Sequence, residues 1–155
     1  MICPFCSSNQ ISVTNSRPTN KGTQIWRRRK CLKCQEIFTT REKIDISYVV
    51  VEKRDGRRVE YSHPKLYSGI YHSFVGRKKI DRGDAGQIAE NVIQKIEEFI
   101  VGQKIKEIKS TEIIRLVVKF LAKQYPDIAL NYYAHFNNGS SLDEYLRKIK
   151  SIIKN

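Results

Sequence analysis

Two pairs of closely spaced cysteines constrain the fold of this chain more than any other feature of its sequence. Cys3 and Cys6 form one Cys-x-x-Cys pair, Cys31 and Cys34 form the other, and residues 7–30 lie between them. Four thiolates around Zn²⁺, each at about 2.3 Å, would join these distant segments and leave no ligand position open for catalysis. The spacing therefore predicts one structural zinc ion per chain. Iron on the same ligands, a redox-active cysteine pair and incidental buried cysteines remain as alternatives.

The charge of the chain favours a polyanionic partner. Its 155 residues include 29 Lys and Arg against 16 Asp and Glu, a formal net charge of +13. Such a surplus is typical of proteins that bind nucleic acid, with an anionic membrane surface as the second choice. No apolar run approaches the roughly 18 residues that span a bilayer, and no basic leader precedes an apolar segment at the N-terminus. We therefore expect a cytoplasmic, non-membrane protein, and in a reducing compartment four cysteines favour a metal site over disulfides.

A change of composition near residue 47 divides the chain into modules. All four cysteines precede this point, in a segment too small to hold an apolar core of its own. The sequence predicts an α+β protein, with a β zinc ribbon over 1–46, a mainly helical domain over 47–139 and an amphipathic C-terminal helix over 140–155. Asp55-Gly56 joins two β-prone segments at the start of the second module, which predicts a hairpin with a type I′ turn.

Local patterns place the individual elements. Strand-like segments in the first module cover 11–14, 23–30 and 36–40. Helical patterns in the second module cover 62–76, 84–102, 110–125 and 127–137. Asp84 with Gln87 resembles a capping box, and Ser110 is a candidate helix cap. Ile88, Val92, Ile96, Phe99 and Ile100 share one face of the second helix.

A strongly basic strand precedes the second cysteine pair. Side chains alternate between the two faces of a strand. Trp26, Arg28 and Lys30 would therefore lie on one face, and Arg27 and Arg29 on the other. Because both faces would be cationic, we infer a surface that contacts nucleic-acid phosphates, with one or two arginines at base edges. A solvated basic face is the simpler alternative, and Trp26 could either stack on a base or cover the metal knuckle.

The motifs of the chain resemble the NrdR family of bacterial transcriptional repressors. The ribbon motifs are Cys3-Pro4-Phe5-Cys6, Ser16-Arg17, Arg27 to Cys34, and Phe38-Thr39-Thr40-x-Glu42. The following motifs, Val51-x-Lys53-Arg54-Asp55-Gly56-Arg57, Lys65-Leu66 and Gly69-Ile70, resemble the start of an ATP-cone. The resemblance extends over about residues 1–139 and includes the order of the two domains.

The resemblance implies a repressor of ribonucleotide reductase genes that binds ATP and dATP in its cone and changes its oligomeric state. Paired operator sites would be bound through the ribbons. The matching positions for nucleotide binding are Val51, Lys53 and Arg54, with Lys65 at the phosphates and Ser110 near the base. The matching positions for DNA are Arg27, Arg28, Arg29 and Lys30, together with Arg17.

The chain departs from the family pattern at two places. Asn15 stands where the family usually has Asp before the Ser-Arg pair. The family pattern Ala-Tyr-x-Arg-Phe, which is associated with nucleotide sensing and subunit contacts, reads Ala129-Leu130-Asn131-Tyr132-Tyr133 here. Tyr132 or Tyr133 could stack on an adenine, although half-buried helix tyrosines are the more common outcome.

The leading hypothesis is a zinc-dependent, nucleotide-responsive repressor that binds double-stranded DNA as a homo-oligomer. The main alternative is a zinc-ribbon module that docks on ribonucleotide reductase or RNA polymerase without operator DNA. An enzyme acting on nucleotides is disfavoured, because the sequence shows no P-loop, nucleophile–base set, carboxylate pair or open metal site. Three histidines without metal-ligand spacing, His63, His72 and His135, are interpreted as surface or helix-packing residues.

Overall fold

The chain divides into two compact units, Met1–Asp45 and Ile46–Asn155. The computed structural model describes residues 1–75, 80–136, 147, 150 and 151, so the predicted C-terminal helix over 140–155 falls largely outside the described residues. Strands form the first unit, and helices with a small sheet form the second, which confirms the predicted α+β class. Ile46, at the end of the predicted first domain, is 6% exposed and lies in the core of the second unit.

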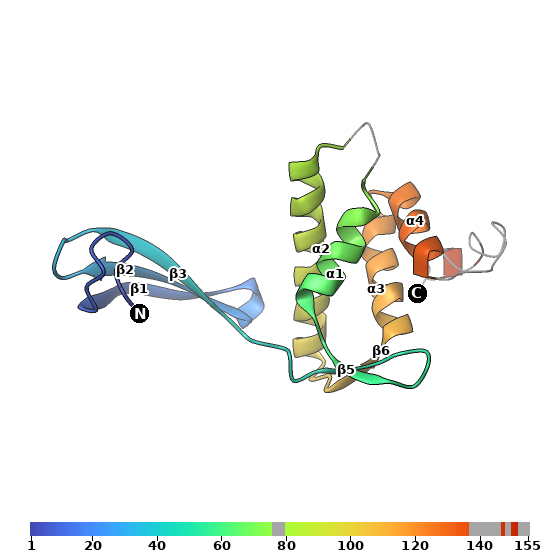
Figure 1. Cartoon of the computed structure of the whole chain (residues 1–155), viewed down its shortest axis with the longest axis horizontal. Coiled ribbons are helices and arrows are strands. Elements are labelled where there is room, and N and C mark those ends of the chain that lie inside the picture. Colours follow the sequence, from blue (N-terminus) through green and yellow to red (C-terminus); the bar gives the residue numbers. More distant parts are fainter. Residues whose placement is uncertain (76–79, 137–146, 148–149, 152–155) are drawn as a thin grey trace. The chain divides into compact units, whose positions relative to one another are not determined.

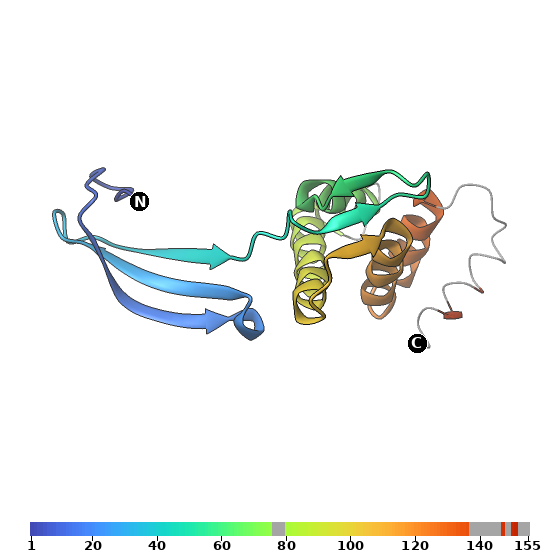
Figure 2. The same cartoon turned by 90° about the horizontal axis from the view of Figure 1, so that it is seen from below.

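The first unit is a three-stranded antiparallel sheet in the order β1-β2-β3 (Figure 2). Its strands are β1 (Ile11–Thr19), β2 (Gln24–Cys31) and β3 (Ile37–Lys43), with the short 3₁₀ helix η1 (Asn20–Gly22) between β1 and β2. β1 extends beyond the predicted segment because its pairing with β2 continues past an irregularity between Val13 and Asn15. Among the side chains described in this unit only Cys3 and Cys31 are buried, so an apolar core is not what holds it together.

The second unit contains a sheet of three short strands in the order β5-β4-β6. β4 (Val50–Glu52) pairs antiparallel with β5 (Arg58–Glu60) and parallel with β6 (Glu107–Lys109). The helices α1, α2 and α3 stand over this sheet in Figure 1. The sequence did not reveal β6, because a three-residue strand with one buried residue, Ile108, is too short to show an alternating pattern.

The predicted hairpin is confirmed, but the predicted type I′ turn is wrong. Gly56 has a φ of 81°, whereas Asp55 is not among the residues with positive φ. The N–H of Gly56 donates to the carbonyl of Lys53 at 3.0 Å, and the N–H of Lys53 donates to the carbonyl of Arg57 at 2.8 Å. The connection is therefore a three-residue loop that ends in a left-handed glycine, which requires positive φ at one position instead of two.

Four helices complete the second unit: α1 (His63–His72), α2 (Arg82–Gly102), α3 (Ser110–Ala122) and α4 (Pro126–Phe136). The prediction of Asp84 as a cap is wrong, since the side chain of Asp81 accepts from the N–H of Gly83 at 2.8 Å and α2 begins earlier. Ser110 is the first residue of α3 and Lys109 is the cap position. α1 ends before the predicted boundary, and a turn follows at Ser73–Val75.

One apolar core joins the helices to the sheet. Its fully buried side chains come from all four helices and the segment before β4, and include Val49, Ile70, Ile93, Ile96, Ile100, Val117, Leu121 and Ile128. The predicted inner face of α2 is confirmed at Val92, Ile96 and Ile100 and wrong at Phe99, which is 38% exposed. Within the described residues, no helix has the length and apolar character needed to cross a membrane.

Candidate metal, nucleic-acid and nucleotide sites

The four cysteine sulfurs converge at one end of the ribbon. All four lie within 4.8 Å of one another. The Sγ–Sγ distance is 3.7 Å between Cys3 and Cys34 and 3.6 Å between Cys6 and Cys31. A tetrahedral Zn²⁺ with Zn–S bonds of about 2.3 Å requires sulfur–sulfur distances of about 3.8 Å. These distances are far too long for disulfides, and they fit a closed four-thiolate metal site.

Two turns of matching geometry present the cysteine pairs. The N–H of Ser7 donates to the carbonyl of Cys3 at 2.9 Å, and the N–H of Gln35 donates to the carbonyl of Cys31 at 3.0 Å. Ser7 and Gln35, each directly after a cysteine pair, have φ values of 57° and 63°. Each pair therefore sits in a tight turn whose left-handed residue reverses the chain, so that both sulfurs of the pair point to the same side.

The pKa values of two of the thiols are shifted in opposite directions. The backbone N–H of Cys34 is the main cause that lowers the pKa of Cys31 to about 6, against the opposing effect of burial. The backbone N–H of Glu36 acts in the same sense on Cys34, but burial and the neighbouring sulfurs outweigh it and raise the pKa of Cys34 to about 12. Zn²⁺ binding would displace the remaining thiol protons, because the thiolate is the ligand.

Several cationic side chains lie on one face of the ribbon sheet. Residues directly opposite in antiparallel strands share a face. Trp26 is opposite Arg17 on one side and Arg41 on the other. Arg28 and Lys30 follow at every second position of β2, so they share the face of Trp26. The guanidinium carbon of Arg17 lies 5.0 Å from the centre of the Trp26 ring, a cation–π contact that holds both side chains on this face. We call Arg17, Arg28, Lys30 and Arg41 the cationic face.

On the opposite face of the same sheet, two arginines share one acidic partner. Arg27 Nε lies 2.9 Å from Glu42 Oε1, and the Nη2 atom of Arg29 lies 3.5 Å from the same oxygen. Arg29 Nε also donates to Thr40 Oγ1 at 2.8 Å. Both faces therefore carry cations, but an acid stands among the paired residues of only one of them. Glu42 engages two of the five predicted DNA-contacting residues, whereas Arg28 has no ion pair with any of the described residues.

The strand pairing places two further residues, Arg41 and Asn15, at the cationic face. Arg41 belongs to this face through its pairing with Trp26, although it lies outside the basic run in the sequence. Asn15 is directly opposite Arg28. The departure from Asp to Asn at this position therefore removes an acid from beside Arg28, because opposite side chains in a sheet lie about 5 Å apart.

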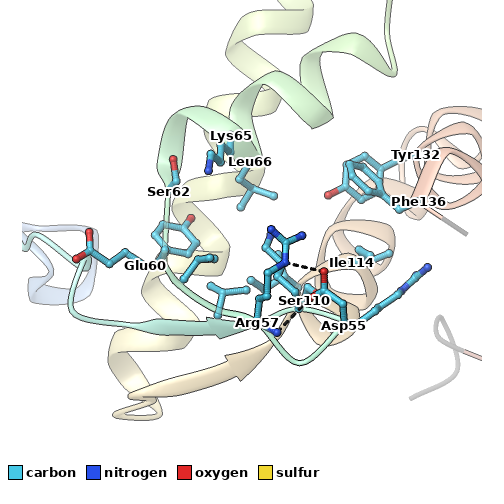
Figure 3. A pocket seen from close by; sticks show the side chains of 16 residues that line it. Asp55, Arg57, Glu60, Ser62, Lys65, Leu66, Ser110, Ile114, Tyr132 and Phe136 are labelled. Atoms are coloured by element: carbon cyan, nitrogen blue, oxygen red, sulfur yellow. Dashed lines mark hydrogen bonds and ion pairs between the residues drawn. The ribbon is translucent and has the colours of Figure 1, made fainter.

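A second site is a cavity of about 420 Å³ in the helical unit (Figure 3), a size typical of small-molecule pockets. All five residues predicted to border a nucleotide line it, although they come from β4, the hairpin loop, α1 and α3: Val51, Lys53, Arg54, Lys65 and Ser110. Arg57 also lines the cavity, and its Nε lies 2.7 Å from Asp55 Oδ2, which holds the hairpin loop in shape. Four basic side chains against two acidic ones favour an anionic ligand.

Two helix N-termini meet at the cavity. Ser62 precedes α1 and Ser110 begins α3, and both line the cavity. Neither helix has a side-chain cap hydrogen bond, whereas α2 is capped by Asp81 away from the cavity. Because the first N–H groups of a helix lack partners within it and carry partial positive charge, both ends are suited to phosphate oxygens.

An aromatic wall closes the other side of the cavity. Tyr132 and Phe136 come from successive turns of α4, with ring centres 4.8 Å apart, and both line the cavity in Figure 3. A Cβ on Gly69 would lie 3.2 Å from Phe136, so the glycine leaves room for that ring. Burial raises the pKa of Tyr132, so its hydroxyl keeps its proton. Phe136 was not predicted as a site residue, although its spacing of four from Tyr132 is the signal that could have found it.

The protein resembles known families over nearly its whole length. Residues 1–42 match the family model described as the N-terminal domain of NrdR-like transcriptional repressors. Residues 49–138 match the ATP cone domain. The first match contains the four cysteines and the whole cationic face, and the second contains every residue that lines the cavity.

Individual relatives cover nearly the whole chain. A protein of Caldicellulosiruptor bescii named transcriptional repressor NrdR is 36% identical over 154 residues, which cover 96% of each chain. A protein of the same name from Streptococcus pneumoniae is 35% identical over 153 residues, covering 96% of this chain and 94% of that protein. A third, from Albidiferax ferrireducens, is 31% identical over 145 residues and 94% of each chain. With its zinc ribbon and ATP-cone, the chain belongs to the NrdR family of transcriptional repressors.

Proposed function

We propose that this protein is a cytoplasmic repressor that binds operator DNA of ribonucleotide reductase genes through its ribbon and senses ATP and dATP in its cone. The observation that carries the proposal is the convergence of Val51, Lys53, Arg54, Lys65 and Ser110 on one cationic cavity, in a chain whose ribbon bears an acid-free cationic face. One zinc ion per chain would hold the ribbon in the shape that displays this face.

The cationic face is the surface that we assign to DNA. Its four cations lie on one rigid sheet, and no acidic residue occupies the paired positions of that face. Such a face suits phosphate contacts, with an arginine free to reach base edges in a groove. Arg27 and Arg29, paired with Glu42, would instead contribute mainly to the shape of the sheet.

The cavity is the site that we assign to the nucleotide. Lys53 and Lys65 make no ion pair with any residue in the described part of the chain, and the open ends of α1 and α3 add N–H donors. These groups suit a triphosphate, and the ring faces of Tyr132 and Phe136 suit a base. We expect the nucleotide to change how the protein forms homo-oligomers, because the spacing of two ribbons sets whether paired half-sites are bound with avidity.

Native mass spectrometry of the purified protein tests the cone and the oligomer together. The protein is measured alone, with ATP and with dATP. One zinc per chain, with bound nucleotide and a nucleotide-dependent subunit number, is expected. A constant mass without bound nucleotide would show that the cone does not sense nucleotides and that the protein is a constitutive DNA- or protein-binding module.

Fluorescence anisotropy with operator DNA tests the ribbon. Arg28→Ala should weaken DNA binding at least several-fold and leave ATP binding unchanged. Arg58→Ala is the matched control, since it removes one arginine from β5, where Arg58 pairs with Glu107 at 2.8 Å, outside the ribbon. Equal effects of the two variants would contradict the assignment of the cationic face.

A second candidate function rests on the apolar residues around the metal knuckles. Ile2 and Phe5 are each 61% exposed and Leu32 is 55% exposed. Exposed apolar side chains gathered at one end of a small module can mark a protein-docking site. A ribbon that captures ribonucleotide reductase or RNA polymerase in a pull-down, but does not shift operator DNA, would favour this candidate.

A further inference from the structure

A histidine at the start of α1 is held between two carboxylates of α2. His63 Nδ1 lies 2.7 Å from Glu97 Oε1, and His63 Nε2 lies 3.0 Å from Glu90 Oε2. The side chain of Glu97 is 8% exposed, whereas that of Glu90 is 44% exposed. The contacts connect residues 34 and 27 positions apart, so they join the first turn of α1 to the middle of α2.

With both carboxylates ionised, the two contacts together require both ring protons. An ionised carboxylate only accepts hydrogen bonds, and a neutral imidazole carries one N–H and one lone pair. A neutral ring would therefore direct its lone pair at one of the two carboxylates. Only the imidazolium can donate to Glu90 and Glu97 at the same time, and its charge then offsets the buried charge of Glu97.

Tyr61 completes the cluster on the side of the cavity. Its hydroxyl lies 3.3 Å from Glu97 Oε1 and donates to it. Burial, followed by the charge of Glu97, raises the pKa of Tyr61, so the hydroxyl remains a donor. The titratable groups around His63 are thus Tyr61 before α1, Glu90 and Glu97 on α2, and Tyr132 on α4, which acts on Tyr61.

The cluster lies directly behind the cavity. Tyr61 and Ser62, which precede His63, and Lys65 and Leu66, which follow it, all line the cavity. Ser62 provides no side-chain cap hydrogen bond to α1. The contacts of His63 with α2, together with the hydrogen bond from Tyr61 to Glu97, anchor this turn behind the cavity.

We propose that His63 is a positioning residue for the nucleotide cavity, whose doubly protonated ring ties the first turn of α1 to Glu90 and Glu97 and makes nucleotide affinity depend on pH. The proposal rests on the proposed nucleotide binding. As pH rises and the ring loses one proton, one of the two contacts is lost. The turn that carries Ser62 and Lys65 then has more freedom, and the phosphate site is less well formed.

Isothermal titration with ATP across pH 6 to 9, on the zinc-loaded full chain, tests the proposal. Because ATP itself titrates in this range, the informative quantity is the ratio of the Kd of a variant to that of the unmodified protein at each pH. His63→Gln should weaken ATP binding about tenfold at the acid end, the effect of one charged hydrogen bond, with the ratio approaching one at the alkaline end. His72→Gln, an exposed histidine on the same helix bonded to Ser68, should give a ratio of one throughout.

Glu90→Gln distinguishes positioning from a general structural role. A glutamine amide can either donate or accept, so a neutral His63 could then keep both of its partners. This variant should retain affinity as pH rises, so that it binds ATP more tightly than the unmodified protein at the alkaline end. Glu90 is half-exposed, so the substitution is expected to leave folding intact. A pH profile of Glu90→Gln or His63→Gln that coincides with that of the unmodified protein would overturn the proposal.

Thermal unfolding separates failure of this proposal from failure of the proposed function. The stability difference between the unmodified protein and His63→Gln should be largest at low pH, where the imidazolium is present, and should diminish as pH rises. This measurement needs no nucleotide. If ATP does not bind at any pH but this stability pattern is present, the proposed nucleotide site is wrong and the ion-pair cluster of His63 is supported. A stability difference that does not depend on pH would overturn the role of the doubly protonated ring.

Discussion

Arg27 Nε lies 2.9 Å from Glu42 Oε1 across β2 and β3, so an acid of β3 offsets part of the positive charge on the face of the ribbon opposite to Arg28. The next residue of the strand, Arg28, faces the other way and is opposite Asn15 and Thr39. Consecutive arginines of one basic run therefore have different roles, because alternation and pairing place them beside different neighbours.

Glu42→Gln should strengthen binding to non-specific duplex DNA. The substitution releases Arg27 and Arg29 from their acidic partner and makes their face of the sheet more strongly cationic. Because each additional phosphate contact adds about 0.9 to the slope of log K against log salt, the salt dependence should become steeper. Anisotropy titrations between about 50 and 200 mM salt measure the slope. Glu107→Gln, which releases Arg58 outside the ribbon, is the matched control. A slope unchanged by Glu42→Gln would show that Arg27 and Arg29 stay away from DNA even when they are unpaired.

Asn15→Asp should weaken DNA binding. The new carboxylate would lie beside Arg28 and compete with phosphate for it, so the salt slope should become shallower by about one phosphate contact. Asn15→Gln keeps the position neutral and should leave the slope unchanged. The same titration at matched salt measures both variants, and tighter binding by Asn15→Asp would count against Arg28 as a phosphate contact.

Removal of the metal should unfold the ribbon and spare the cone. The described side chains of the first unit include only two that are buried, both cysteines, so little else can hold its fold. Cys31→Ser, or a strong chelator, should abolish DNA binding. ATP binding should persist, because the described residues of the second unit's apolar core include none from Met1–Asp45. Far-UV circular dichroism and ATP titration of the same sample report the two effects. Simultaneous loss of both would mean that the cone depends on the ribbon.

Gly56→Ala should destabilise the hairpin that carries Lys53 and Arg54. Gly56 has a φ of 81°, where a Cβ costs about 1–2 kcal/mol, although no atom lies within 4 Å of the added carbon. ATP affinity should fall together with the melting temperature. Gly102→Ala is the matched control, since Gly102 also has open space for a Cβ but lies at the end of α2 without positive φ, where alanine is favoured by about 1 kcal/mol. Equal melting temperatures for the two variants would contradict the argument from backbone strain.

Local patterns predicted long helices well, and predicted helix caps and turns, which depend on a few residues, less well. The inner face of α2 was correct at Val92, Ile96 and Ile100, because three turns of apolar repeat outweigh any single residue. The cap of the same helix was misplaced at Asp84, since Asp81 satisfies the same chemistry one turn earlier. The hairpin at Asp55-Gly56 was found, but its loop length depends on which residues pair, which Asp-Gly alone does not specify.

The sequence by itself determined the α+β class and the pairing of cysteines typical of a zinc ribbon, and its family motifs predicted a two-domain division and five nucleotide-binding residues. The class and the cysteine pairs depend on short, local patterns, whereas only the structure brings the five residues, which are up to 59 positions apart, to one cavity. Only the tertiary structure decided that Glu42 neutralises Arg27, that Arg41 joins the cationic face, and that His63 lies between Glu90 and Glu97. These relations join residues 15 to 34 positions apart. They depend on strand register and on the packing of α1 against α2, which no local pattern encodes.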